Sequence, residues 1–184
     1  LFKNATGSYN TAIGYSALQG TNSSTNIFRN TGVGYQVMLN NAGNDNTAMG
    51  YQALVDNTGA ENVAIGGLAM NKNTSGSYNA AFGYIALYNN TTGEYNTAIG
   101  HRSLHDNTTG GRNTALGYKS MWQNTTGSQN VGIGYEALKA NTTGSEHTAI
   151  GYQALTANTT GTQNSAFGRS ALGSNTTGNY NNAF

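Results

Sequence analysis

The chain has 184 residues, including 26 Gly but no Pro and no Cys; charged residues make up 8% and the formal net charge is +1. So few charges argue against nucleic-acid binding, which needs clustered Lys and Arg. The lack of Cys excludes disulfides, thiolate metal sites and cysteine nucleophiles. No run of about 18 apolar residues exists that would predict a membrane-spanning helix.

The N-terminal part, residues 1–61, is an irregular version of one repeated unit. Residues 4–7 match the end of a unit, and the unit that starts at Asn10 is three residues longer than the common frame. The extra residues fall between Gln19 and Arg29, where we expect a bulged loop, because insertions in solenoids collect at turns. The next two units are each one residue short.

Residues 62–184 keep a strict 17-residue period, with N-T-A-I-G-Y-x-A-L-x-x-N-T-T-G-x-x as the typical unit. The unit starts lie at Asn62, Asn79, Asn96, Asn113, Asn130, His147, Asn164 and Asn181. A fixed period of this length is typical of a solenoid. We therefore interpret 1–184 as a single repeat array of about ten coils of 16–20 residues, a fragment of a longer fibrous protein.

Alternation within N-T-A-I-G-Y indicates a β-strand in which the Thr and Ile positions share one face, while Ala and Gly share the other. The Ile position, with Ile99 and Ile133 as examples, is apolar in every unit, and so is a second position five residues later, with Leu104 and Leu138. We expect both columns to form the core of an all-β parallel β-solenoid with two short strands per coil. At about 4.8 Å per coil the stack would be roughly 50 Å long.

Two glycine columns and two asparagine columns complete the frame. The Gly of N-T-T-G, such as Gly93, is expected to have a positive φ, and the Gly after Ile, such as Gly100, to permit a bend or a close backbone approach. The leading residues Asn79, Asn96, Asn113 and Asn130 predict a ladder of hydrogen-bonded amides, and the Asn of N-T-T-G predicts a second. His147 interrupts the first ladder.

Ordering one coil costs backbone entropy, and the few large side chains that the coil buries barely offset that cost. We therefore expect the chain to associate with copies of itself. Small residues allow close approach, and the Ala/Gly face is the expected contact surface. A parallel homotrimer would keep every copy in register.

The N-T-A-I-G core, as in residues 96–100, 62–66 and 130–134, resembles the head repeats of YadA-like trimeric autotransporter adhesins of the haemagglutinin/invasin type. That resemblance implies a left-handed parallel β-roll, assembly as a trimer, and a place on a bacterial surface where host components are bound. The longer unit with N-T-T-G is also similar to repeats in tail-fibre proteins of phages and injection systems.

Motifs for catalysis, metal binding or cofactor binding are missing from the sequence. His101, His105 and Asp106 lie close together in one unit, either as polar decoration of a turn or as a metal or acid–base site. Directly after the Leu column, successive coils place Tyr88, His105 and Trp122, an aromatic strip on which sugar rings could stack.

These observations favour a non-enzymatic fibre or adhesin segment of a bacterial cell surface that presents a multivalent binding surface and needs no cofactor. Its expected partners are two copies of itself and a host-surface glycan or protein, without nucleic acid or membrane contact. The alternatives are a tail-fibre segment of a virion or injection system, glycan binding by the aromatic strip, and ice binding. Ice binding would use a Thr column: Thr92, Thr109, Thr126, Thr143, Thr160 and Thr177.

Overall fold

The computed structural model describes residues 7–20 and 26–184, in which every regular element is a short β-strand. The strands are β1 (Thr11–Ile13), β2 (Thr31–Val33), β3 (Thr47–Met49), β4 (Val63–Ile65), β5 (Ala80–Phe82), β6 (Thr97–Ile99), β7 (Thr114–Leu116), β8 (Val131–Ile133), β9 (Thr148–Ile150), β10 (Ser165–Phe167) and β11 (Asn182–Ala183). Helices are absent from the described ranges, so none there could cross a membrane. The expected bulge between Gln19 and Arg29, and the partial unit at residues 4–7, lie mostly outside the described residues.

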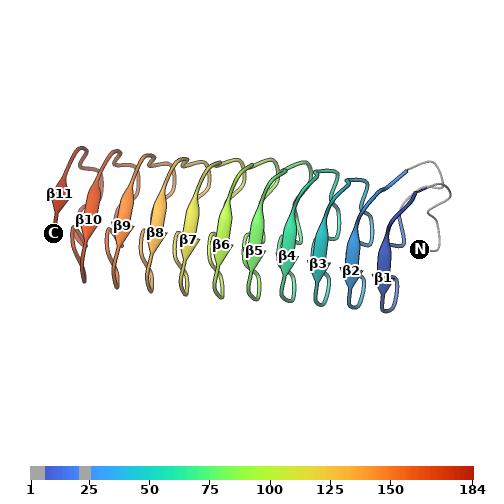
Figure 1. The fold of residues 1–184 in the computed structure, drawn as a ribbon. Helices are drawn as coiled ribbons and strands as arrows, with labels where there is room; N and C mark the ends of the chain where they lie inside the picture. The colour runs from blue at the N-terminus through green and yellow to red at the C-terminus, as the bar shows by residue number, and fades with distance from the viewer. Residues whose placement is uncertain (1–6, 21–25) are drawn as a thin grey trace.

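The strands form one 11-stranded parallel sheet in the order of the sequence, with one strand from each coil (Figure 1). Equivalent positions are paired, as in Thr97 with Thr114 and Ile99 with Leu116. The coils are therefore stacked in register, and the chain is a parallel β-solenoid of about ten turns. This confirms the fold class that the 17-residue period predicts.

The second strand that we expected in each coil does not form. The Y-x-A-L segment is instead a series of turns in which every second residue is left-handed, with φ of 50° at Ile85 and 51° at Leu87. Its backbone still bonds to both neighbouring coils, because the Ile85 N–H donates to Gly67 O and the Leu87 N–H donates to Ser103 O. The prediction of two strands was wrong because side-chain periodicity does not report the sign of φ.

The two faces of each strand are reversed relative to the prediction. The central Ala is buried, with Ala98 at 0% exposure, whereas the Ile column faces outward, with Ile99 at 39% and Leu116 at 43%. Ile133 is only partly buried. The coil is too thin for large residues on both sides, since a Cβ placed on Gly132 would lie 3.1 Å from Met121 Cγ.

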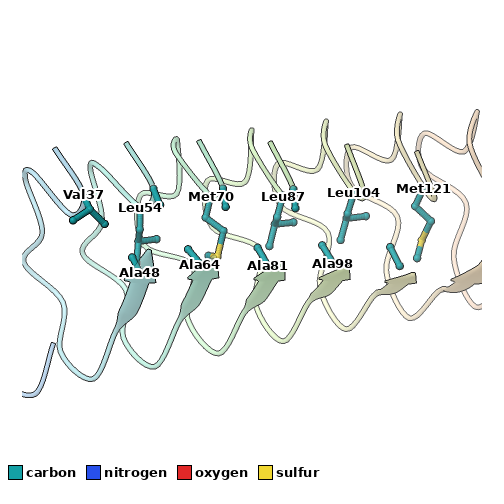
Figure 2. Packing of buried hydrophobic residues seen from close by; sticks show 14 of the residues in the cluster. Val37, Ala48, Leu54, Ala64, Met70, Ala81, Leu87, Ala98, Leu104 and Met121 are labelled. Carbon is teal, nitrogen blue, oxygen red and sulfur yellow. The ribbon is translucent and has the colours of Figure 1, made fainter. Parts of the chain in front are cut away.

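The Leu column forms the core as predicted. Leu104 and Leu138 are fully buried, and this column faces the strand Ala column across the narrow interior (Figure 2). The residue before each Leu or Met forms a third buried column, of Ala and Ser apart from Val37, in which Ser103 Oγ donates to Ala115 O. The interior thus contains one large apolar side chain in most coils, surrounded by small residues, and Val37 beside Met38 in one coil.

Of the two glycine columns, the one after Ile has the predicted close backbone approach, whereas the turn column lacks the predicted positive φ. Gly100 has a φ of 131°, and a Cβ there would meet Gly117 O at 2.6 Å. Gly93 is not left-handed, but a Cβ on it would meet Gly110 O at 2.4 Å. The turn glycine is therefore required because the backbones of adjacent coils nearly touch. The strand-end glycine is required for the same reason and also for its positive φ.

Substitution of Leu104 by Ile tests the left-handed core column. All ten residues at this position, from Leu18 to Leu172, are Leu or Met and have φ near 50°, a conformation that is strongly unfavourable for β-branched side chains. Leu104→Ile keeps the volume but should lower the free energy of unfolding by about 2 kcal/mol. Leu104→Met, the matched control, should cost less than about 1 kcal/mol.

Urea denaturation followed by circular dichroism measures both variants. Equal midpoints for the Ile and Met variants would show that backbone conformation does not select the residue type here.

Candidate functional site

Two columns of buried Asn side chains join each coil to the next. In the first column, which contains Asn79, Asn96, Asn113 and Asn130, the side-chain oxygen accepts the backbone N–H of the next member. Asn79 Oδ1, for example, accepts the Asn96 N–H at 2.9 Å. The side-chain nitrogen donates to a turn glycine, as from Asn96 Nδ2 to Gly110 O at 2.9 Å. This ladder therefore links amide side chains mainly to main chain, with an amide-to-amide bond at some steps, as from Asn79 Nδ2 to Asn62 Oδ1 at 3.2 Å.

The second column is the amide-to-amide ladder that the sequence predicts. Asn107 Nδ2 donates to Asn90 Oδ1 at 2.7 Å, and Asn124 Nδ2 donates to Asn107 Oδ1 at 2.9 Å. The other hydrogen of each amide goes to the turn glycine, as from Asn107 Nδ2 to Gly110 O. Each turn is thus closed by a buried side chain that also carries the stack.

His147 replaces Asn in the first ladder and reproduces two of its hydrogen bonds. Its Nδ1 accepts the Asn164 N–H at 3.2 Å, as an Asn oxygen would, and its backbone N–H donates to Asn130 Oδ1. Its Nε2 lies 3.1 Å from Asn158 Nδ2, an amide of the second ladder. Burial is the main cause that lowers the pKa of His147 below 6.5. A proton on Nδ1 would point at the Asn164 N–H and remove the hydrogen bond between them.

The outward Ile column is the site feature that the sequence analysis missed. Its large apolar side chains are exposed on the sheet face along most of the stack: Ile13, Met49, Phe82, Ile99, Leu116, Ile150 and Phe167. The column contains no charged residue, and this was already visible in the sequence. What could not be read from the sequence is that this column points to solvent.

The Tyr column lies next to this face and is exposed and stacked. Ring centroids are 5.5 Å apart between Tyr84 and His101, 5.5 Å between His101 and Tyr118, and 5.2 Å between Tyr118 and Tyr135. His101 is therefore part of an aromatic stack and lies away from the turn that holds His105. Within the described residues, no group of three or more His, Asp or Glu could hold a metal ion.

The predicted strip of Tyr88, His105 and Trp122 is only partly stacked. Tyr88 and His105 are parallel at 5.3 Å, and His105 Nδ1 lies 2.6 Å from Asp106 Oδ1. No ring contact joins His105 to Trp122 in the part of the chain that is described. All three rings are half-buried.

A lysine lies over the ring at each end of the strip, Tyr88 and Trp122. Lys72 Nζ lies 5.1 Å from the Tyr88 ring centre, and Lys119 Nζ lies 4.7 Å from that of Trp122. Lys139 also approaches Trp122, while donating to Glu136 at 2.9 Å. Burial acts to raise the pKa of Glu136, but hydrogen bonds from Lys139 and Gln153 outweigh it and lower that pKa. Glycan binding by this strip stays a prediction.

The Thr column considered for ice binding faces solvent, since all six of its members are exposed. The preceding Thr of each turn differs, because its hydroxyl donates to the next coil, as from Thr108 Oγ1 to Thr125 O at 3.1 Å. Only one Thr per coil is therefore free to face water at this turn. Ice binding likewise stays a prediction.

Comparison with protein-family models, with curated proteins and with solved structures finds no match to this chain. The functional argument therefore rests on the geometry of the solenoid itself.

Replacement of His147 by Asn tests the first ladder as a source of acid sensitivity. The folded pKa of His147 lies below its unfolded value of 6.5, so its contribution to stability is complete above about pH 6.5 and is lost as the pH falls toward the folded pKa. We expect the melting temperature to fall more between about pH 7.5 and about pH 5 in the wild type than in His147→Asn. Parallel pH profiles would contradict this assignment, since all other titratable groups are shared by the two proteins.

Proposed function

We propose that this chain is a structural, non-enzymatic segment of a homotrimeric fibre on a bacterial cell surface, and that the outward Ile column is its self-association surface. The observation that carries the proposal is the row of Ile, Leu, Met and Phe side chains on the sheet face, which are exposed in most coils and half-buried in the others. Exposed apolar patches of this extent mark interaction sites in soluble proteins. The outward Ile column replaces the Ala/Gly face as the proposed contact surface, because the Ala/Gly face lies in the core.

The size of the surface fits an interface between copies. A stack of about ten coils at roughly 4.8 Å each is about 50 Å long, and the strand face together with the Tyr column spans about 13 Å. The resulting area of about 650 Å² is close to the roughly 800 Å² per partner of a standard interface. The Ile column alone would be only about half as wide and would fall short, so the Tyr column is part of the proposed contact.

The regularity of the stack favours parallel copies. Every coil presents the same column at the same spacing, so copies that share one axis direction match coil by coil, as cyclic symmetry requires. Three copies are proposed because the N-T-A-I-G repeats resemble trimeric adhesin heads. The same assembly would serve a tail fibre, and the bacterial surface is preferred on that resemblance alone.

Charge placed on the outer column tests the proposal. We expect the wild type to have the mass of three chains by light scattering, and the double variant Ile99→Asp, Leu116→Asp to be a monomer, because burying two unpaired carboxylates in an apolar interface is strongly unfavourable. Both side chains face solvent in the single chain, so circular dichroism should be unchanged.

The matched control is Thr109→Asp, Thr126→Asp, which places two carboxylates on the exposed turn column of successive coils. It should remain a trimer. A monomeric wild type, or loss of the trimer in the control to the same extent, would overturn the proposal.

A further inference from the structure

An open hollow of about 280 Å³ lies at the corner between the N-T-T-G turns and the strand starts, on three successive coils. Its lining residues are Thr92, Glu94, Tyr95, Thr109, Gly111, Arg112 and Ser128. The corner is a separate column from the aromatic strip, and it precedes the strands whose outer face forms the proposed interface. It also contains two of the few charges of this chain.

Gly111 lines the hollow at a position that is Ser in three coils, Ser77, Ser128 and Ser145, and varies in the others, as in Ala60 and Thr162. There the Ser hydroxyl accepts the backbone N–H of the preceding coil, as Ser128 Oγ accepts the Gly111 N–H at 3.1 Å. Gly111 has no hydroxyl, so the Glu94 N–H has no acceptor within the described chain. A Cβ on Gly111 would lie 3.8 Å from this nitrogen, which marks the hollow as the place of the missing side chain.

Opposite charges flank the hollow without neutralising each other. Glu94 and Arg112 are both exposed, and their backbones are joined because the Arg112 N–H donates to Glu94 O at 2.9 Å. Their side chains form no ion pair in the described part of the chain. The guanidinium instead lies over the Tyr95 ring, with Cζ 5.8 Å from the ring centre.

We propose that this hollow binds one neutral saccharide unit. The Glu94 carboxylate accepts hydrogen bonds from a pair of neighbouring sugar hydroxyls, while the Arg112 guanidinium and the free Glu94 N–H donate to sugar oxygens. The hydroxyls of Thr92 and Thr109, which make no hydrogen bond in the described chain, supply further partners of either kind. The volume lies just below the range of about 300–1,000 Å³ typical of drug-sized ligands, so a single sugar ring is the appropriate size.

The opposite charges of Glu94 and Arg112 favour a ligand without net charge. Glu94 disfavours an anion and Arg112 disfavours a cation, so a neutral molecule with many hydroxyls suits both best. Both faces of the Tyr95 ring are covered, by Arg112 on one side and by Tyr78 at 4.8 Å on the other. The sugar is therefore held by hydrogen bonds and not by ring stacking, and a single site is weak. Repetition of the chain in an assembly would raise its avidity.

Saturation-transfer NMR with neutral methyl glycosides tests the site in the intact chain. The informative variants restore residues that other coils carry at the same positions: Gly111→Ser fills the hollow, Glu94→Ser removes the acceptor, and Arg112→Gln removes the guanidinium, as at Ser128 and Gln129. Because these residues fit equivalent coils, the variants should fold, and circular dichroism confirms it. Each should weaken binding about tenfold or more, as expected for loss of charge-assisted hydrogen bonds.

Two further measurements separate this site from its neighbours. Trp122→Ala should leave the saturation transfer unchanged, and so should Ile99→Asp, Leu116→Asp, whether or not the protein is then a monomer. Glucuronate should bind the wild type more weakly than the neutral glycosides and should gain in Glu94→Ser, where Arg112 remains. Absence of any transfer with the wild type, persistence of binding in Gly111→Ser, or its loss in Trp122→Ala would overturn the proposal.

Discussion

The structure depends on buried Asn side chains that carry hydrogen bonds from one coil to the next. The strands are only two or three residues long and by themselves would hold neighbouring coils together weakly. The two Asn columns add main-chain and side-chain bonds at the corners, where Asn96 and Asn107 are fully buried and satisfied. An unpaired buried amide is costly, so each ladder stabilises only the in-register stack and penalises any slip. His147 keeps this arrangement only as a neutral ring.

Because the corners are filled with amides, the interior is narrow, and this determines the surface. One Leu or Met per coil meets the strand Ala across the core (Figure 2). The remaining large apolar residue of each coil, as at Ile99, has no room inside and faces outward. A regular apolar column on the sheet is thus a direct consequence of the thin core, and it is the physical basis of the proposed assembly.

The same regularity shows where a coil departs from its neighbours. At three corners a Ser hydroxyl accepts a backbone N–H of the preceding coil, as Ser145 Oγ does for the Ser128 N–H. Gly111 lacks this hydroxyl and lines the hollow between Glu94 and Arg112. Structure in this chain comes from what is constant along the stack, whereas specific recognition is expected where one position differs. The two proposals therefore concern different residues and are tested separately.

The sequence by itself determined the period, the parallel in-register stack, the buried Leu column and the presence of Asn ladders, because each follows from residue types that recur at fixed spacing. It also showed that Thr97 and Ile99 share one strand face, since side chains alternate along a strand. Only the tertiary structure decided which face is inside, because that depends on whether the coil is wide enough to hold Ile. The space around Ala98 is too narrow for an Ile side chain. It likewise decided that Leu104 is left-handed and that Gly93 permits contact between coils rather than a positive φ. Backbone conformation and the distance between coils are set by packing against the neighbouring coils. Side-chain periodicity in the sequence predicts neither of them.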